Sequence, residues 1–285
     1  MITTPSLIVY ALFLLAILLS LAYFRRYRMP QPPLGRLNLW DVALTMAVIV
    51  LIPYLHLLLP GWANTLFLSL ITTSLLYFFL EPIIALRPLR WLVVLGLVAV
   101  GVVAAYLLPA GSLGYTAIND ALIILSVVAV SNIWVQSGVS ARDLVILALA
   151  IAAYDFIFTG LLPVTADLFA QLDNLPFVPM IAWRDGEVWA AIGLGDTLMA
   201  SAFVLVLYKA WGRGAAAIGL AGMALAYPLL FALPLLSQLF VTTAYPAMVI
   251  IGPVQLLVYL FCRQRYGAER TMREYRASQV RSQAL

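Results

Sequence analysis

The chain has 285 residues, of which 65% are hydrophobic and only 10% are charged. So few charged side chains cannot cover a soluble globule of this length, which excludes a soluble protein and predicts a polytopic membrane protein. The net charge of +4 does not indicate nucleic-acid binding, because the basic residues lie at the ends of apolar segments and form no nucleic-acid module.

Apolar runs of about 20 residues, the length that crosses a hydrocarbon core, recur along the chain. We expect the first to be retained in the protein, because no charged residue precedes it and its apolar core is longer than that of a signal peptide. The predicted spans are 5–24, 40–59, 62–86, 91–108, 116–135, 143–162, 187–208, 215–236 and 244–261. The sequence therefore predicts an all-α membrane protein of about nine transmembrane helices, with one long loop at 163–186.

Lysine and arginine accumulate in short cytoplasmic loops of membrane proteins. If the first span runs from outside to inside, fifteen of the sixteen basic residues fall on the cytoplasmic side and only Arg184 falls outside. We therefore expect an N-terminus outside and a cytoplasmic C-terminus.

Two acids lie deep in successive spans, where a carboxylate is costly and indicates a functional site. Asp155 follows Asp143 by twelve residues, and Asp196 precedes Lys209 by thirteen. At about 1.5 Å per helical residue, both lie roughly 18 to 20 Å from the cytoplasmic ends of their helices. Adjacent antiparallel helices would therefore bring the two carboxylates level.

A pair of carboxylates can share one proton, because two like charges a few Å apart do not both ionise cheaply. The ionised acid can activate a water as general base while the protonated acid donates to a peptide carbonyl. Gly193 and Gly195 can let another backbone approach Asp196 closely. The same residues also fit a proton-coupled transporter or channel, and the chemistry alone leaves protease and transporter open.

A third motif opens the last span, where Pro246, Ala247 and Met248 stand at a helix boundary. In the order Tyr154-Asp155, then Gly193-Leu194-Gly195-Asp196, then Pro246-Ala247-Met248, the chain resembles the presenilin and signal peptide peptidase family of intramembrane GxGD aspartyl proteases. That family carries YD on its sixth span, GxGD on its seventh and PAL at its ninth. The resemblance covers about 143–261, and spans one to five carry no matching motif.

The resemblance implies that Asp155 and Asp196 are the catalytic aspartates of an intramembrane aspartic endopeptidase, with a catalytic water and no metal or other cofactor. It implies that the other motif residues shape the site or bind substrate: Tyr154, Gly193, Leu194, Gly195, Pro246, Ala247 and Met248. Met248 replaces the family's leucine, a volume-conserving change that bears on substrate preference.

The same resemblance implies a domain organisation and a setting. We expect one membrane-embedded domain over 1–285, with a helix scaffold at 1–136, a catalytic half at 143–261 and a basic cytoplasmic tail at 262–285. The substrates would be transmembrane helical peptides or membrane proteins of type II orientation, because the outside N-terminus is like that of signal peptide peptidase. The compact chain is similar to small prokaryotic members, which implies a multi-pass protein of a prokaryotic cell membrane. Nothing in the sequence requires an accessory subunit.

A prepilin-peptidase-like GxGD protease is an alternative, although the lysine commonly found shortly after that motif is absent from Thr197-Leu198-Met199. A transporter lacks the visible inverted repeat expected of that class.

Two further hypotheses concern single segments. The 163–186 loop and the 243–248 corner can offer backbone edges to an unwound substrate strand; the loop can dip into the membrane interface through Leu172, Leu175, Phe177 and Val178. The lone His56 is expected to be a packing residue, because no second histidine can share a metal.

Overall fold

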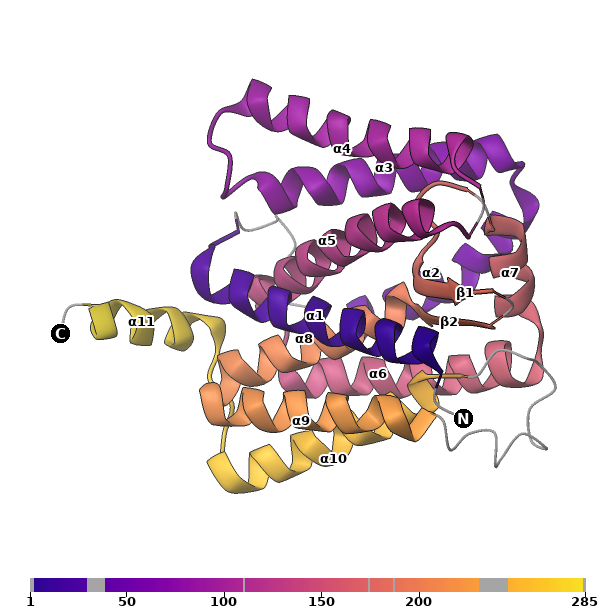
Figure 1. Ribbon diagram of the computed structural model, residues 1–285. Helices are drawn as coiled ribbons and strands as arrows, with labels where there is room; N and C mark the ends of the chain where they lie inside the picture. Colours follow the sequence, from indigo (N-terminus) through magenta and orange to yellow (C-terminus); the bar gives the residue numbers. More distant parts are fainter. Residues whose placement is uncertain are drawn as a thin grey trace.

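Helices make up most of the computed structural model, which describes residues 3–29, 39–109, 111–173, 175–186, 188–230 and 246–283 (Figure 1). The α-helices are α1 (Thr4–Arg26), α2 (Leu39–Leu58), α3 (Gly61–Leu80), α4 (Arg87–Leu107), α5 (Leu113–Ser137), α6 (Ala141–Asp155), α7 (Val164–Leu172), α8 (Leu194–Trp211), α9 (Arg213–Leu230), α10 (Met248–Tyr266) and α11 (Met272–Gln283). A π-helical segment, η1 (Phe156–Leu161), continues α6, and two strands, β1 (Met180–Asp185) and β2 (Val188–Gly193), precede α8.

Seven helical segments of the described chain are long and apolar enough to cross a membrane by length and composition: α1, α3, α4, α5, α6 with η1, α8 and α9. α2 adds a shorter apolar stretch at 43–58. Large apolar side chains such as Leu51, Leu92 and Leu225 are exposed on the outer helices, as expected of surfaces that face lipid. The chain is therefore a helical multi-pass membrane protein. Residues 231–236 and 244–245 of the last two predicted spans lie outside the described ranges.

Local caps mark the ends of α5 and the start of α6. The Ser112 and Ser140 side chains accept hydrogen bonds from the backbone N–H groups of Tyr115 and Asp143, the usual role of serine at an N-cap. Gly138 ends α5 with φ of 107°, a left-handed conformation that glycine adopts at little cost. Gly138 and the Ser140 cap thus fix the tight turn between α5 and α6.

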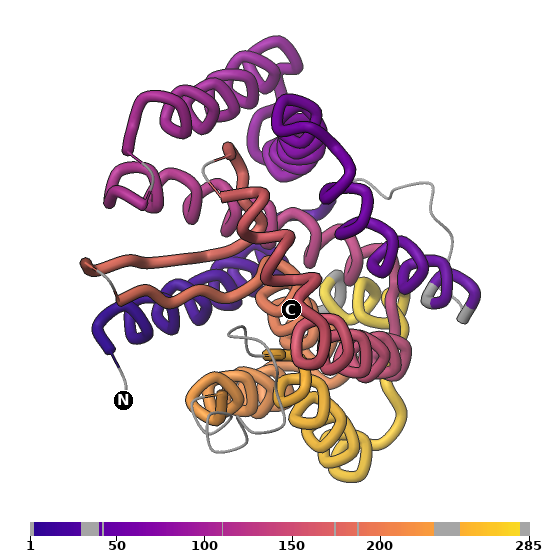
Figure 2. Tube along the Cα trace, turned by 90° about the vertical axis from the view of Figure 1, so that its right-hand side faces the viewer, coloured from indigo at the N-terminus to yellow at the C-terminus, as the bar shows by residue number. Residues whose placement is uncertain are grey.

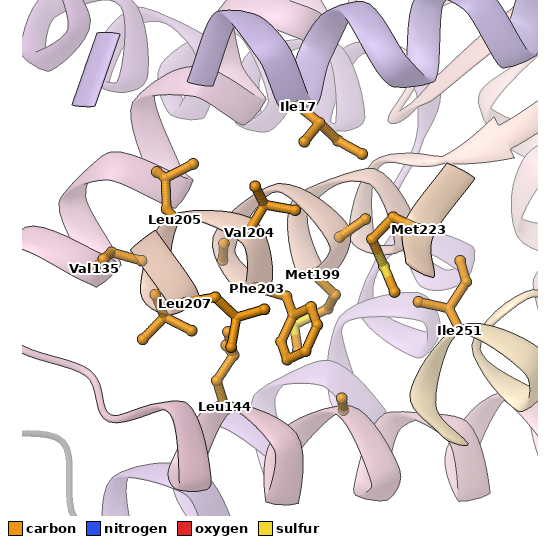
Figure 3. Packing of buried hydrophobic residues seen from close by; sticks show 14 of the residues in the cluster. Ile17, Val135, Leu144, Met199, Phe203, Val204, Leu205, Leu207, Met223 and Ile251 are labelled. Atoms are coloured by element: carbon orange, nitrogen blue, oxygen red, sulfur yellow. The ribbon is translucent and has the colours of Figure 1, made fainter. Parts of the chain in front are cut away.

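The most enclosed helices are α8 and α5, with 72% and 67% of their span windows buried, against 28–39% for the other five candidate spans. Figure 3 shows α8 surrounded by side chains from five other helices, including Ile17 of α1, Val135 of α5, Leu144 of α6, Met223 of α9 and Ile251 of α10. The central helix of the fold is therefore α8, which carries Asp196 in its first turn.

The predicted seventh span, 187–208, is only partly helical. The strands β1 and β2 pair as an antiparallel hairpin in which Met180 is opposite Gly193 and Asp185 is opposite Val188. Gly186, with φ of 60°, lies in the turn, and α8 starts only at Leu194. A short apolar run such as 188–193 is compatible with a buried strand or with a helix. The sequence therefore predicts a helix that begins several residues before α8 does. The hairpin packs between α1 and α5, as Figure 2 shows.

The predicted 163–186 loop is also structured. It contains α7, and Leu172, Phe177 and Val178 pack with Leu175 into a cluster formed mainly by α3, α4 and α5. Phe177 has φ of 63°, and its ring fills the space over Gly101, where a Cβ atom would lie 2.5 Å from the Phe177 Cε1 atom. These apolar residues are therefore held inside the protein.

A candidate two-aspartate active site

Asp155 is the last residue of α6, immediately before the π-helical segment. π-helical turns commonly occur at functional sites. The Thr159 hydroxyl hydrogen-bonds to the Asp155 carboxyl, and it lies 2.8 Å from the Thr165 hydroxyl at the start of α7. Sequence reasoning missed Thr159, although its position four residues after Asp155 places it on the same helical face.

Asp196 lies in the first turn of α8, three residues after the N-cap Gly193. Its carboxyl folds back and accepts a hydrogen bond from the Gly193 backbone N–H. This arrangement is the backbone half of a capping box, in which an acidic side chain at the third helical position satisfies the N-cap N–H. The positive end of the helix dipole also favours a carboxylate there.

The fold brings the two acids together. α6 packs against α8, and the carboxylates of Asp155 and Asp196 are close enough to interact electrostatically. Both side chains are half-buried. The arrangement is that of a half-buried carboxylate pair in which each acid accepts a hydrogen bond from a backbone N–H.

The third motif contacts the first acid directly. Pro246 and Met248 are buried at the start of α10 and Ala247 is half-buried, and the Met248 backbone N–H donates to Asp155 Oδ2 at 2.9 Å. Behind this contact, Gly252 lets α10 approach α6 closely, since a Cβ there would lie 3.1 Å from the Ala148 carbonyl oxygen. Residues 243–245 of this predicted corner lie outside the described chain.

The remaining motif residues are neighbours of the two acids in the chain and differ in their packing. The Tyr154 ring stacks on the Phe158 ring, with the two ring centroids 4.7 Å apart. Leu194 is partly buried against the central core. Gly195 is exposed, and a Cβ there would meet no described atom within 4 Å, so no described backbone approaches this glycine closely.

The expected role of Gly193 also differs from what the structure shows. A Cβ at Gly193 would lie 2.9 Å from Asp196 Oδ2. The space beside this glycine is therefore filled by the folded-back acid itself and not by a second backbone.

A third acid, Asp120 of α5, is only 3% exposed, and sequence reasoning placed it near a span end. It is the eighth residue of α5, and its Oδ1 accepts from the Ala182 backbone N–H of β1 at 3.1 Å. The neighbouring Asn119 side chain donates to the carbonyls of Val178 and Met180. The two side chains therefore hold β1, and through the hairpin they help to position the start of α8.

His56 is buried and hydrogen-bonded between α2 and α3. Its Nδ1 lies 2.7 Å from Asn64 Oδ1, and the Gln171 side chain of α7 donates to the His56 carbonyl. This histidine thus has a packing role, as expected. Among the described residues, no three His, Cys, Asp or Glu side chains are grouped so that they could hold a metal ion.

No protein-family model matches the chain, and no curated protein matches it either.

Proposed function

We propose that the protein is an intramembrane aspartyl protease that hydrolyses peptide bonds within transmembrane segments or signal peptides. The observation that carries the proposal is the pairing of Asp155 and Asp196 from two packed helices, with a backbone N–H on each. The resemblance of the three motifs to the presenilin and signal peptide peptidase family supports it. We further propose that the protein crosses a prokaryotic cell membrane nine times, with its N-terminus outside.

The chemistry needs one proton shared by the pair. The ionised acid removes a proton from water, and the resulting hydroxyl adds to the scissile carbonyl carbon while the other acid protonates the carbonyl oxygen. Collapse of the tetrahedral intermediate breaks the C–N bond: the acid that took the water's proton gives a proton to the leaving nitrogen, and the other acid takes back its proton from a hydroxyl of the intermediate as the C=O bond re-forms. The hydrogen bonds from Met248 and Gly193 hold the two carboxyls in fixed orientations during these transfers.

A helical substrate must unwind before its carbonyl can be attacked, and an extended chain can then add to a strand edge. The outer edge of β1 is covered, because Ala182 N–H and Met180 C=O bond to α5. In an antiparallel pair, alternate residues of each strand direct their N–H and C=O groups toward the partner strand. Since those of Met180 and Ala182 face α5, Ile181 and Trp183 bond to β2, and the N–H and C=O groups of Trp189 and Ala191 on β2 point away from β1. In the described chain these groups have no hydrogen-bond partner.

Because β1 is covered, the edge proposed for substrate addition is β2, which leads directly into Gly193 and Asp196, in place of the β1 part of the expected 163–186 segment. The other expected edge, the 243–248 corner, lies partly outside the described residues. Amide exchange with and without a peptide inhibitor would test this addition. Protection of Trp189 and Ala191 is expected on inhibitor binding, and unchanged exchange at both would contradict strand addition.

The test of the function is cleavage of a single-span type II substrate by purified protein in detergent, with the cut located by mass spectrometry. Asp155→Asn and Asp196→Asn are each expected to lower the rate at least about 100-fold, the scale of general acid–base catalysis. Asp167→Asn is the matched control, because Asp167 is an exposed acid in the first turn of α7 and should retain activity.

Cleavage within the apolar span by the wild type and the control, but not by the two site variants, would establish the function. Cleavage that survives both substitutions, or no cleavage of several substrates by folded protein, would reject it. Uptake of a solute driven by a proton gradient, with no peptide cleaved, would assign the same acids to transport.

A further inference from the structure

A cationic pocket lies between the C-terminal end of α1 and α11, far from the aspartate pair. Its volume is about 120 Å³. It is lined principally by Phe24, Arg25, Arg26, Arg28, Tyr275 and Arg276. Four arginines thus line the pocket from two segments that are about 250 residues apart in the chain.

These arginines lack acidic partners in the described chain. The ion pairs found there involve Arg90 with Glu81 and Arg142 with Asp143, so no described carboxylate lies within 4.0 Å of the pocket arginines. The Arg276 Nε is buried and has no hydrogen-bond partner among the described residues. A buried N–H donor without an acceptor is costly, and a guanidinium matches the paired oxygens of a phosphate.

The walls of the pocket are ordered by packing and hydrogen bonds. The Tyr275 ring of α11 packs on Phe24 of α1 at 5.6 Å and on Tyr208 of α8 at 6.1 Å, measured between ring centroids. On the other side, the Gln136 side chain of α5 donates to the Tyr27 carbonyl and accepts from the Met29 N–H. The segment that carries Arg25 to Arg28 is therefore tied to the helix bundle.

The location of the pocket identifies its ligand. Arg25 and Arg26 end α1, a candidate membrane span, so the pocket lies where lipid headgroups meet water. α11 extends from the bundle at this same end (Figure 1). Basic clusters directly beyond a span attract anionic lipids, and the Phe24 and Tyr275 rings give the pocket an apolar wall.

We propose that this pocket binds the phosphate of an anionic phospholipid from the leaflet at the C-terminal end of α1. The lipid phosphate accepts hydrogen bonds from the arginines of α1 and α11 and holds α11 against the membrane domain. This inference requires a membrane protein but does not depend on the proteolytic activity.

Native mass spectrometry of the full chain in nonionic detergent, titrated with phosphatidylglycerol or phosphatidylcholine, tests the proposal. Phosphatidylglycerol is expected to bind more tightly. Replacement of Arg25, Arg28 and Arg276 by glutamine should weaken binding by about fivefold for each arginine, on the order of 100-fold together.

The matched control replaces three exposed arginines, Arg213, Arg263 and Arg273, by glutamine. It removes the same charge outside the pocket and should keep most of the phosphatidylglycerol affinity. The single variant Arg276→Gln is the second test if the triple variant does not fold, and its expected loss is about fivefold.

Three results would overturn the proposal. Equal loss in the pocket and control variants would show general surface attraction. Equal binding of phosphatidylglycerol and phosphatidylcholine would exclude recognition of an anionic lipid. Complete displacement of phosphatidylglycerol by millimolar inorganic phosphate, with phosphate alone raising the melting temperature equally, would assign the pocket to a soluble anion.

Discussion

Asp196 is oriented by the glycine three residues before it. The Gly193 N–H donates to the Asp196 carboxyl, and the missing Cβ of Gly193 leaves the room that this carboxyl fills. Gly195, by contrast, borders no described atom at the position of a Cβ. The two glycines of one motif therefore have different physical roles.

At this scale, we predict that Gly193→Ala lowers the cleavage rate about 10- to 100-fold, because a methyl group 2.9 Å from Asp196 Oδ2 must displace the carboxyl. Gly195→Ala, the matched control, should cause a smaller loss. Initial rates on the type II substrate, measured with circular dichroism as a check of folding, compare the two. A Gly195→Ala loss as large as that of Gly193→Ala would contradict the separate roles.

At the scale of elements, the site depends on the contact between α10 and α6. The Met248 N–H at the start of α10 donates to Asp155 at the end of α6, and Gly252 lies one turn further along α10. A Cβ there would be 3.1 Å from both the Ala148 carbonyl oxygen and the Ala152 Cβ. The close approach of the two helices thus sets the position of the proline-bearing corner relative to Asp155.

We therefore predict that Gly252→Val separates α10 from α6 and lowers both the melting temperature and the cleavage rate. Overpacking of this kind costs about 1–3 kcal/mol. Gly252→Ala should give an intermediate result. Gly96→Val on α4 is the matched control, because a Cβ at Gly96 meets no described atom within 4 Å; an equal loss of stability in this control would show that valine itself, and not the helix contact, is responsible.

The N-terminus of α11 is closed by a capping box. The Thr271 N–H and hydroxyl donate to Glu274 Oε2 at 2.7 and 3.0 Å, and the Glu274 N–H donates back to the Thr271 hydroxyl oxygen at 3.3 Å. The backbone hydrogen bond from Thr271, followed by that from its hydroxyl, lowers the pKa of Glu274 from its ordinary value of 4.5.

A carboxyl whose pKa is lower in the folded state stabilises the fold above its unfolded pKa and loses that contribution as the pH falls through the folded pKa. We predict that the first turn of α11 loses amide protection as the pH falls below about 4.5. Glu274→Gln keeps a capping-box acceptor and should remove this dependence. Hydrogen exchange at a series of pH values, corrected for the intrinsic rate, measures it, and an identical pH profile in Glu274→Gln would contradict the assignment.

At the scale of the whole molecule, the N-terminal helices are part of the same packed unit as the site. Side chains of α1 and α5 join those of α6, α8, α9 and α10 in one core. α1 also contacts the β1–β2 hairpin. α1 and α5 therefore pack directly on the helix that carries Asp196 and on the hairpin before it.

The proposed orientation places the N-terminal end of α5 outside the cell and its C-terminal end in the cytoplasm. With Cys262 replaced by serine, Ser112→Cys should react with an impermeant maleimide on intact cells, and Ser140→Cys should react only after the cells are opened. The two sites are matched, because both are N-cap serines. The distribution of basic residues is the physical reason for the expectation, and the reverse labelling pattern would invert the topology.

The sequence by itself determined the membrane class and the approximate helix ranges, because burial in lipid requires long apolar segments whatever their neighbours. It also singled out Asp155 and Asp196, since a deep acid is costly in any arrangement of helices. Only the tertiary structure decided the local details. An apolar run such as 188–193 is compatible with strand or helix until Asn119 and Asp120 of α5 hold its partner strand.

The same holds for contacts between distant segments. The Met248 hydrogen bond to Asp155 and the meeting of Arg25, Arg28 and Arg276 at one pocket join residues about 90 and 250 positions apart. Such contacts depend on how helices pack against one another, which apolarity alone does not specify, because side chains that face lipid and side chains that face another helix are equally apolar.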